Sequence, residues 1–227
     1  MSITILFIVI TVLISYRAFT DSQLKSNLLM HPQSVDEFGQ FYRFVSSGFV
    51  HADWTHLGIN MFVLWMFGEA VENGIGIADA EGYLAEVVGF STVFGGVMGK
   101  VNFVILYIGS IIAGSIPSFI KHKSNGHYSA LGASGGTAGI LFAYIFFGPW
   151  NPLYFIFFPF IGIPAIIIGI LYLVYSSYMA KNGNDNIGHD AHFWGGVFGL
   201  VYTALAVLVK DPEVFSSTID RLLQGPL

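Results

Sequence analysis

Long apolar stretches separated by short polar segments run through the chain and predict membrane-spanning helices. A helix needs about 20 mostly apolar residues to cross roughly 30 Å of hydrocarbon. Stretches near this length, or extendable to it, cover residues 1–16, 55–67, 101–120, 134–147, 153–178 and 191–209. The pattern therefore predicts an all-α integral membrane protein in which six transmembrane helices form one domain over residues 1–227.

Some of these boundaries depend on local features. No Asp, Glu, Lys or Arg lies between Lys123 and Lys181. That length holds two spans, and the Gly- and Pro-rich residues 148–152 supply the turn between them. Residues 1–16 lack the basic start and the small-residue cleavage site of a signal peptide, so we expect a retained span. Residues 87–99 are apolar but short and Gly-rich, which favours a re-entrant or interfacial piece.

The composition supports lipid as the solvent. Hydrophobic residues make up 54% of the chain and charged residues 10%, whereas about 25% charge is usual in soluble domains. The mean hydropathy is +0.68. Cysteine is absent, which excludes disulfides, thiolate metal sites and a cysteine nucleophile. The net charge is −5 and the nine basic residues are scattered, so we expect no nucleic-acid partner.

Polar side chains at membrane depth are costly and mark candidate functional positions. His56 and Asn60 are four residues apart, so they share one face of the predicted second span. Both side chains can donate hydrogen bonds. His51 lies five residues before His56 and is expected in the loop that enters this span. The alternative interpretation is hydrogen bonding between helices, a common use of His and Asn in membranes.

Two further clusters consist mainly of small residues. The eight residues 132–139 are all small and surround Ser134. In the sixth span, His192, Gly195 and Gly199 fall on one helical stripe. Small residues let helix backbones approach each other closely. Taken alone, Ser134 can be only a helix cap and His192 only a packing histidine.

Together, the three clusters contain the parts of a serine hydrolase. Close packing of the glycine stripe on the small-residue helix would bring Ser134 and His192 within hydrogen-bonding reach. Serine becomes nucleophilic when a base such as imidazole takes its proton. His56, Asn60 and a backbone N–H near Ser134 are suitable donors to an oxyanion. Such a reaction requires neither a metal nor a cofactor.

The same residues carry a family resemblance. The motifs are Tyr42-Arg43, His51-x4-His56-x3-Asn60, Gly132-Ala133-Ser134-Gly135 and Ala191-His192-x2-Gly195-x3-Gly199. In this order, with a core of about residues 41–209, the chain resembles the rhomboid intramembrane proteases. The resemblance implies a dyad of Ser134 as nucleophile and His192 as general base and acid. It also implies an oxyanion hole of His56, Asn60 and the Ser134 N–H, and transmembrane proteins in the lipid bilayer as substrates.

Other positions match the family less closely. Tyr42-Arg43 stands where the family usually has Trp-Arg, in the first outer loop. Glu72 matches a family glutamate that we interpret as structural. Some members have a tyrosine four residues after the nucleophile, on which the histidine ring stacks, but here the residue is Ala138. This leaves open what orients His192. The connection over residues 73–100 is longer than the family's usual loop, and no function is assigned to it.

The resemblance also implies a topology with both termini in the cytoplasm. That arrangement puts six of the nine basic residues outside, against the positive-inside rule. The catalytic motifs are more specific than this imbalance, so we follow the resemblance. The minimal six-span layout favours a bacterial inner membrane.

Two functions from other classes compete with proteolysis. A catalytically inactive relative would bind transmembrane helices as a chaperone or trafficking factor, but such proteins typically lack the serine or the histidine. A transporter with a histidine proton relay would show internal repeats and paired acids at mid-membrane, and neither is evident. A metal site at His189, Asp190 and His192 lacks a third well-spaced ligand on one helix face.

Overall fold

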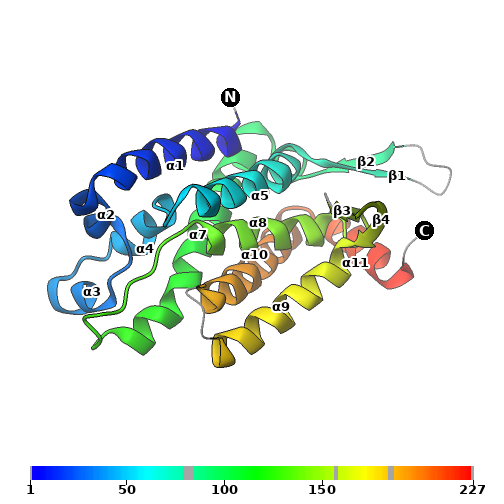
Figure 1. Cartoon of the computed structure of the whole chain (residues 1–227). Helices are drawn as coiled ribbons and strands as arrows, with labels where there is room; N and C mark the ends of the chain where they lie inside the picture. The colour runs from blue at the N-terminus through cyan, green and yellow to red at the C-terminus, as the bar shows by residue number, and fades with distance from the viewer. Residues whose placement is uncertain (1, 79–83, 156–157, 184–186, 226–227) are drawn as a thin grey trace.

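Six long helices make up most of the computed structural model, which describes residues 2–78, 84–155, 158–183 and 187–225 (Figure 1). They are α1 (Ile3–Thr20), α5 (Trp54–Asn73), α7 (Gly96–His122), α8 (Ser134–Phe147), α9 (Ala165–Asn182) and α10 (His189–Lys210). Four of these, α1, α7, α9 and α10, are long and apolar enough to cross a membrane, and α8 is apolar but shorter. The chain is therefore mostly helical, with four or five candidate membrane spans.

Short elements connect the long helices. Between α1 and α5 lie α2 (Ser22–Leu28), α3 (Pro32–Phe38), α4 (Arg43–Ser46) and the 3-10 helix η1 (Ser47–Phe49). An antiparallel hairpin of β1 (Ile75–Ala78) and β2 (Leu84–Val88), then α6 (Phe90–Phe94), join α5 to α7. A second antiparallel hairpin, β3 (Pro152–Phe155) and β4 (Phe158–Pro164), joins α8 to α9, and α11 (Pro212–Gln224) follows α10. Gly76 pairs with Val87 in the first hairpin, and Leu153 with Ile163 in the second.

The hairpins correct two sequence-based predictions. The fold is not purely α-helical, and the predicted fifth span over residues 153–178 is wrong in its first part. The helix begins at Ala165, because the preceding segment pairs as a hairpin with Pro152 opposite Pro164. Proline has no N–H for a helical hydrogen bond, whereas Phe, Ile and Tyr favour strands.

The structure shows which elements form residues 87–99, for which we predicted a re-entrant or interfacial piece. This segment is divided among the end of β2, the short helix α6 and the first turn of α7. Gly95 separates α6 from α7 with a φ of +80°, a left-handed conformation that glycine adopts without strain. The longer connection is therefore a hairpin and a short helix that lead into α7.

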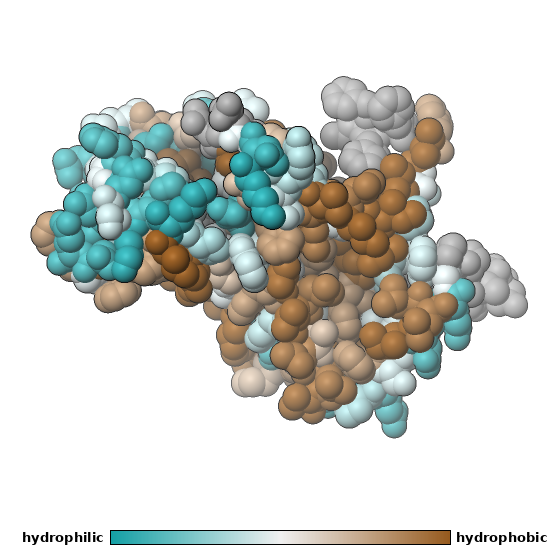
Figure 2. All heavy atoms as spheres, turned by 90° about the horizontal axis from the view of Figure 1, so that it is seen from below, coloured by the Kyte–Doolittle hydropathy of each residue, from teal (hydrophilic) through white to brown (hydrophobic). Residues whose placement is uncertain are grey.

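The order of the connections sets the direction of each helix. The helices α5, α8 and α10 begin at the end of the bundle where α1, α7 and α9 finish, as Figure 1 shows. Nearly all of α8 is buried, and it packs on α5, α7 and α10. Figure 2 shows polar residues gathered at the end that carries α2 and α3, with apolar residues over much of the remaining visible surface. This distribution agrees with helices surrounded by lipid and one end in contact with water.

Candidate active site

Ser134 is the first residue of the central helix α8 and is half-buried. Its backbone N–H is one of the first four in the helix, and these have no partner within the helix. The chain reaches this position through Gly132, whose φ is +116° and whose N–H donates to Ser47 O at 2.9 Å. The local turn therefore presents the Ser134 N–H and side chain at the end of the helix.

The backbones of α8 and α10 meet along a stripe of glycines. A Cβ added at Gly195 would lie 2.8 Å from Gly135 Cα and still closer to its carbonyl oxygen. One turn further on, a Cβ at Gly199 would lie 2.6 Å from the carbonyl carbon of Gly139. The two helices pack as the small-residue pattern predicted. Since both helices begin at the same end, Ser134 and His192 stand on neighbouring first turns.

His192 lies in the first turn of α10 among aromatic rings. Its backbone N–H donates to Gly188 O at 3.1 Å. Its imidazole stacks on the ring of Tyr172 from α9, with centroids 5.8 Å apart and planes 24° from parallel. The His189 ring meets the His192 ring edge-on, also at 5.8 Å. The sequence pattern does not indicate Tyr172 as a neighbour of His192, because the contact depends on the rotation of α9.

His56, one of the predicted oxyanion donors, lies against the turn before Ser134. A Cβ added at Gly132 would lie 2.8 Å from His56 Nε2, so only glycine leaves room for this ring. The Ala52 N–H points at His56 Nδ1 at 3.5 Å, a long hydrogen bond that favours the proton on Nε2. With that tautomer, the N–H of His56 lies on the side of the ring near Gly132.

Asn60 is buried one turn along α5 and held at both ends of its amide. Its Nδ2 donates to His56 O at 2.9 Å, which leaves the second N–H of this group for another acceptor. The Thr137 hydroxyl lies 3.3 Å from Asn60 Oδ1 and 3.1 Å from Ser134 O. Thr137 therefore links the predicted donor to the first turn of α8. Its position three residues after Ser134 was the available sequence signal for this contact.

Hydrogen bonds of His51 connect the turn before Ser134 to the first helix. The Ala133 N–H donates to His51 Nε2 at 3.2 Å, so the proton of the neutral ring is on Nδ1, 2.9 Å from Ser15 Oγ. Ser15 Oγ in turn donates to Phe49 O at 3.0 Å. Burial, aided by nearby His56, lowers the pKa of His51 to about 3. The ring therefore stays neutral at physiological pH, and this hydrogen-bond pattern persists.

Arg43 and Tyr42 organise the first loop. The buried Arg43 guanidinium donates to Ser26 O at 2.8 Å and to Leu29 O at 2.6 Å. The Tyr42 hydroxyl donates to Asn27 O at 3.1 Å. These bonds hold the end of α2 against α4, which is a structural role.

Glu72 caps the first helix from the far end of α5. Its buried carboxylate accepts from the Ile3 N–H at 2.7 Å, and from the Thr4 N–H and hydroxyl at 2.8 Å each. A carboxylate at a helix N-terminus satisfies unpaired N–H groups and opposes the helix dipole. These contacts support the structural interpretation of Glu72.

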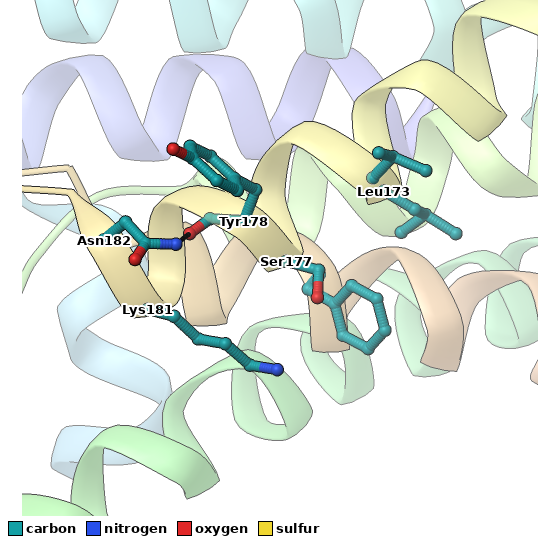
Figure 3. A pocket seen from close by; sticks show the side chains of 7 residues that line it. Leu173, Ser177, Tyr178, Lys181 and Asn182 are labelled. Atoms are coloured by element: carbon teal, nitrogen blue, oxygen red, sulfur yellow. Dashed lines mark hydrogen bonds between the residues drawn. The ribbon is translucent and has the colours of Figure 1, made fainter.

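A shallow groove of about 430 Å³ runs along the outer side of α9 beside the first turn of α10 (Figure 3). Its wall consists of Leu173, Val174, Ser177, Tyr178, Lys181 and Asn182 from α9 and Phe193 from α10. Neither Ser134 nor His192 lines it. The groove is therefore separate from the polar cluster at the starts of α5, α8 and α10.

The fold and this polar cluster define a helical membrane protein with a serine, histidines and hydrogen-bond donors at one end of its bundle. The rhomboid domain family matches residues 38–208. The chain therefore belongs to the rhomboid family, and the resemblance found in its motifs is confirmed.

Individual relatives are similar over most of the chain. "RHOMBOID-like protein 12, mitochondrial" of Arabidopsis thaliana is 28% identical over 195 residues, which are 84% of this chain and 53% of that protein. "Rhomboid protease GluP" of Bacillus subtilis is 28% identical over 83% of this chain and 30% of that protein. "Rhomboid protein 1, mitochondrial" of Saccharomyces cerevisiae is 27% identical over 70% and 40%. The chain thus spans about half or less of the length of these relatives.

Proposed function

We propose that this protein is an intramembrane serine endopeptidase in which Ser134 is the nucleophile and His192 the general base and acid. The observation that carries the proposal is the backbone contact between α8 and α10 at Gly135 and Gly195. It joins the two helices at the ends where the dyad residues lie. Family membership supports the same conclusion, since a relative is named a rhomboid protease.

The proposed reaction follows from these groups. Ser134 Oγ attacks the peptide carbonyl while the His192 imidazole takes its proton. The oxyanion accepts hydrogen bonds from the Ser134 N–H, His56 Nε2–H and the second N–H of Asn60 Nδ2. The tetrahedral intermediate collapses, and His192 gives its proton to the leaving amine. Water, activated by the same imidazole, then hydrolyses the acyl enzyme.

The length of α8 suggests how water reaches the dyad. Its 14 residues measure about 21 Å, less than the roughly 30 Å of hydrocarbon. If the Phe147 end reaches one membrane surface, Ser134 lies about 9 Å below the other. The polar starts of α5, α8 and α10 then line a wet recess that opens to that surface. We infer a bundle of six spans, in which α5 and the recessed α8 join the four long apolar helices. Both chain ends then lie on the cytoplasmic side.

The proposed substrates are transmembrane segments of other membrane proteins. A protease must reach an extended peptide, and each unpaired peptide group in lipid costs several kcal/mol. Small or helix-breaking residues near the end of a segment lower the cost of unwinding it. For localisation we propose a multi-pass protein of a bacterial inner membrane.

The direct test uses the purified protein in lipid vesicles with a single-span reporter whose end carries Gly and Ala residues. We expect two products that share one cleavage site by mass spectrometry, and labelling of Ser134 by a fluorophosphonate. Binding of the reporter without cleavage or labelling would instead indicate the inactive relative, a helix-binding chaperone or trafficking factor.

The oxyanion donors provide a second test. His56→Ala and Asn60→Ala are each expected to lower kcat by roughly 10- to 1,000-fold, because each removes a donor to charge that develops in the transition state. Reporter turnover at saturating substrate measures the effect. Asn73→Ala is the matched control, since Asn73 is exposed at the opposite end of α5. Wild-type kcat in both donor variants would reduce His56 and Asn60 to packing groups.

A further inference from the structure

Tyr172 connects three helices through a row of aromatic rings. On one side it contacts Phe142 of α8, with centroids 6.1 Å apart and planes 52° from parallel. On the other side it stacks on His192 of α10 at 5.8 Å and 24°. At this separation and angle the Tyr172 ring and the His192 imidazole form an offset stack.

Close helix contacts surround the position of this ring. Phe142 is buried, and a Cβ added at Gly196 of α10 would lie 2.7 Å from its Cδ2. One turn before Tyr172, a Cβ at Gly169 would lie 2.6 Å from Ile145 Cδ1 and 3.3 Å from Phe142 Cε1. Glycines on both α9 and α10 therefore allow these helices to pack closely on α8. These contacts place α9 against α8 one turn before Tyr172.

On α8, the position one turn after Ser134 carries no ring. The α8 residue one turn after Ser134 is Ala138, whose methyl group is too small to stack on an imidazole. His189 meets His192 edge-on and lies in the same first turn of α10. The plane of the Tyr172 ring is 24° from that of the His192 imidazole, whereas the His189 ring is 76° from it.

We propose that Tyr172 is a positioning residue for the reaction: its ring holds the His192 imidazole in the plane from which it takes the Ser134 proton. This inference rests on the proposed function. A base must lie within about 2.6–3.2 Å of the proton it abstracts, and a misplacement of 1 Å costs on the order of 100-fold in rate. The stack restricts rotation of the imidazole about its Cβ–Cγ bond. It also makes the orientation of the base depend on where α9 sits.

The test compares two substitutions at one position. Tyr172→Phe keeps the ring and removes only the hydroxyl, so kcat should stay within about twofold of wild type. Tyr172→Leu keeps an apolar side chain and loses the ring. Stacking of two rings raises the population of the stacked imidazole orientation roughly three- to tenfold. We therefore expect kcat to fall about tenfold in Tyr172→Leu, with KM unchanged. Tyr178→Leu, the same change at an exposed position on α9, should leave both constants unchanged.

A spectroscopic readout reports the stack without reference to cleavage. A ring above the imidazole shifts its Cδ2–H and Cε1–H resonances upfield in a 13C-histidine NMR spectrum, in which His192→Ala identifies the signals. The shift should be present in wild type and Tyr172→Phe and absent in Tyr172→Leu. Equal melting temperatures for the three proteins would show that the fold is retained.

Each remaining outcome contradicts one of the two proposals. Wild-type kcat in Tyr172→Leu, an equal loss in Tyr172→Phe, or a raised KM at constant kcat would overturn the positioning role. The raised KM would indicate a substrate contact instead. A wild-type protein that neither cleaves the reporter nor reacts with fluorophosphonate would overturn the proposed function and the catalytic role of Tyr172 with it. The upfield shift would then report only a packing contact.

Discussion

Ser134→Ala and His192→Ala are each expected to reduce reporter cleavage to the background rate, a loss on the order of 10⁴-fold or more. Alanine at position 134 removes the attacking oxygen. Alanine at position 192 removes the group that takes the proton from Ser134 and returns one to the leaving amine. The two residues act in one step, so the double variant should be no slower than either single variant.

The measurement is cleavage of the single-span reporter in vesicles, followed over hours to reach the low rates. Ser217→Ala and His127→Ala serve as controls. Ser217 bonds within α11 to Val214 O, and His127 is an exposed loop residue. Both controls should cleave at the wild-type rate. Substantial activity in Ser134→Ala would show that another group is the nucleophile, and an additive loss in the double variant would show that the two residues act in separate steps.

The sequence predicted the helix contacts that depend on side-chain size. The small residues around Ser134 and the stripe of Gly195 and Gly199 indicated that α8 and α10 would meet, and their backbones do meet. The reason is that close approach requires residues without large side chains, which the sequence displays directly. The position of His56 against Gly132 agrees with the same reasoning, because the ring fills the space left by the missing Cβ.

Other features depended on information that hydropathy does not carry. The apolar run before Ala165 suited a span, but β3 and β4 pair there as a hairpin between Pro152 and Pro164. A buried helix and an apolar hairpin both appear in the sequence as a continuous run of hydrophobic residues, so hydropathy does not distinguish them. The ring of Tyr172 is one of several tyrosines on α9, and only the rotation of that helix selects it as the neighbour of His192. Thr137 lies three residues after Ser134 in the sequence, but its contact with Asn60 depends on how α5 packs on α8.

Gly195→Ala is expected to lower both kcat and stability, because it disrupts the backbone contact on which the proposed dyad depends. The added methyl group would lie 2.8 Å from Gly135 Cα and closer still to the Gly135 oxygen. These are backbone atoms of a buried helix and cannot move aside singly, so α10 must shift away from α8. Overpacking of this kind typically costs about 1–3 kcal/mol of stability.

The same shift carries His192 away from Ser134, since the histidine lies one turn before Gly195 on α10. A displacement on the order of 1 Å costs roughly 100-fold in kcat. Reporter cleavage and the melting temperature measure the two effects. Gly58→Ala is the matched control, because this glycine is also helical but a Cβ there would meet nothing within 4 Å. Alanine favours helix over glycine by about 1 kcal/mol, so Gly58→Ala should be neutral or slightly stabilising. Gly195→Ala with wild-type kcat and melting temperature would mean that α8 and α10 do not touch at this point, and the dyad would lose its structural basis.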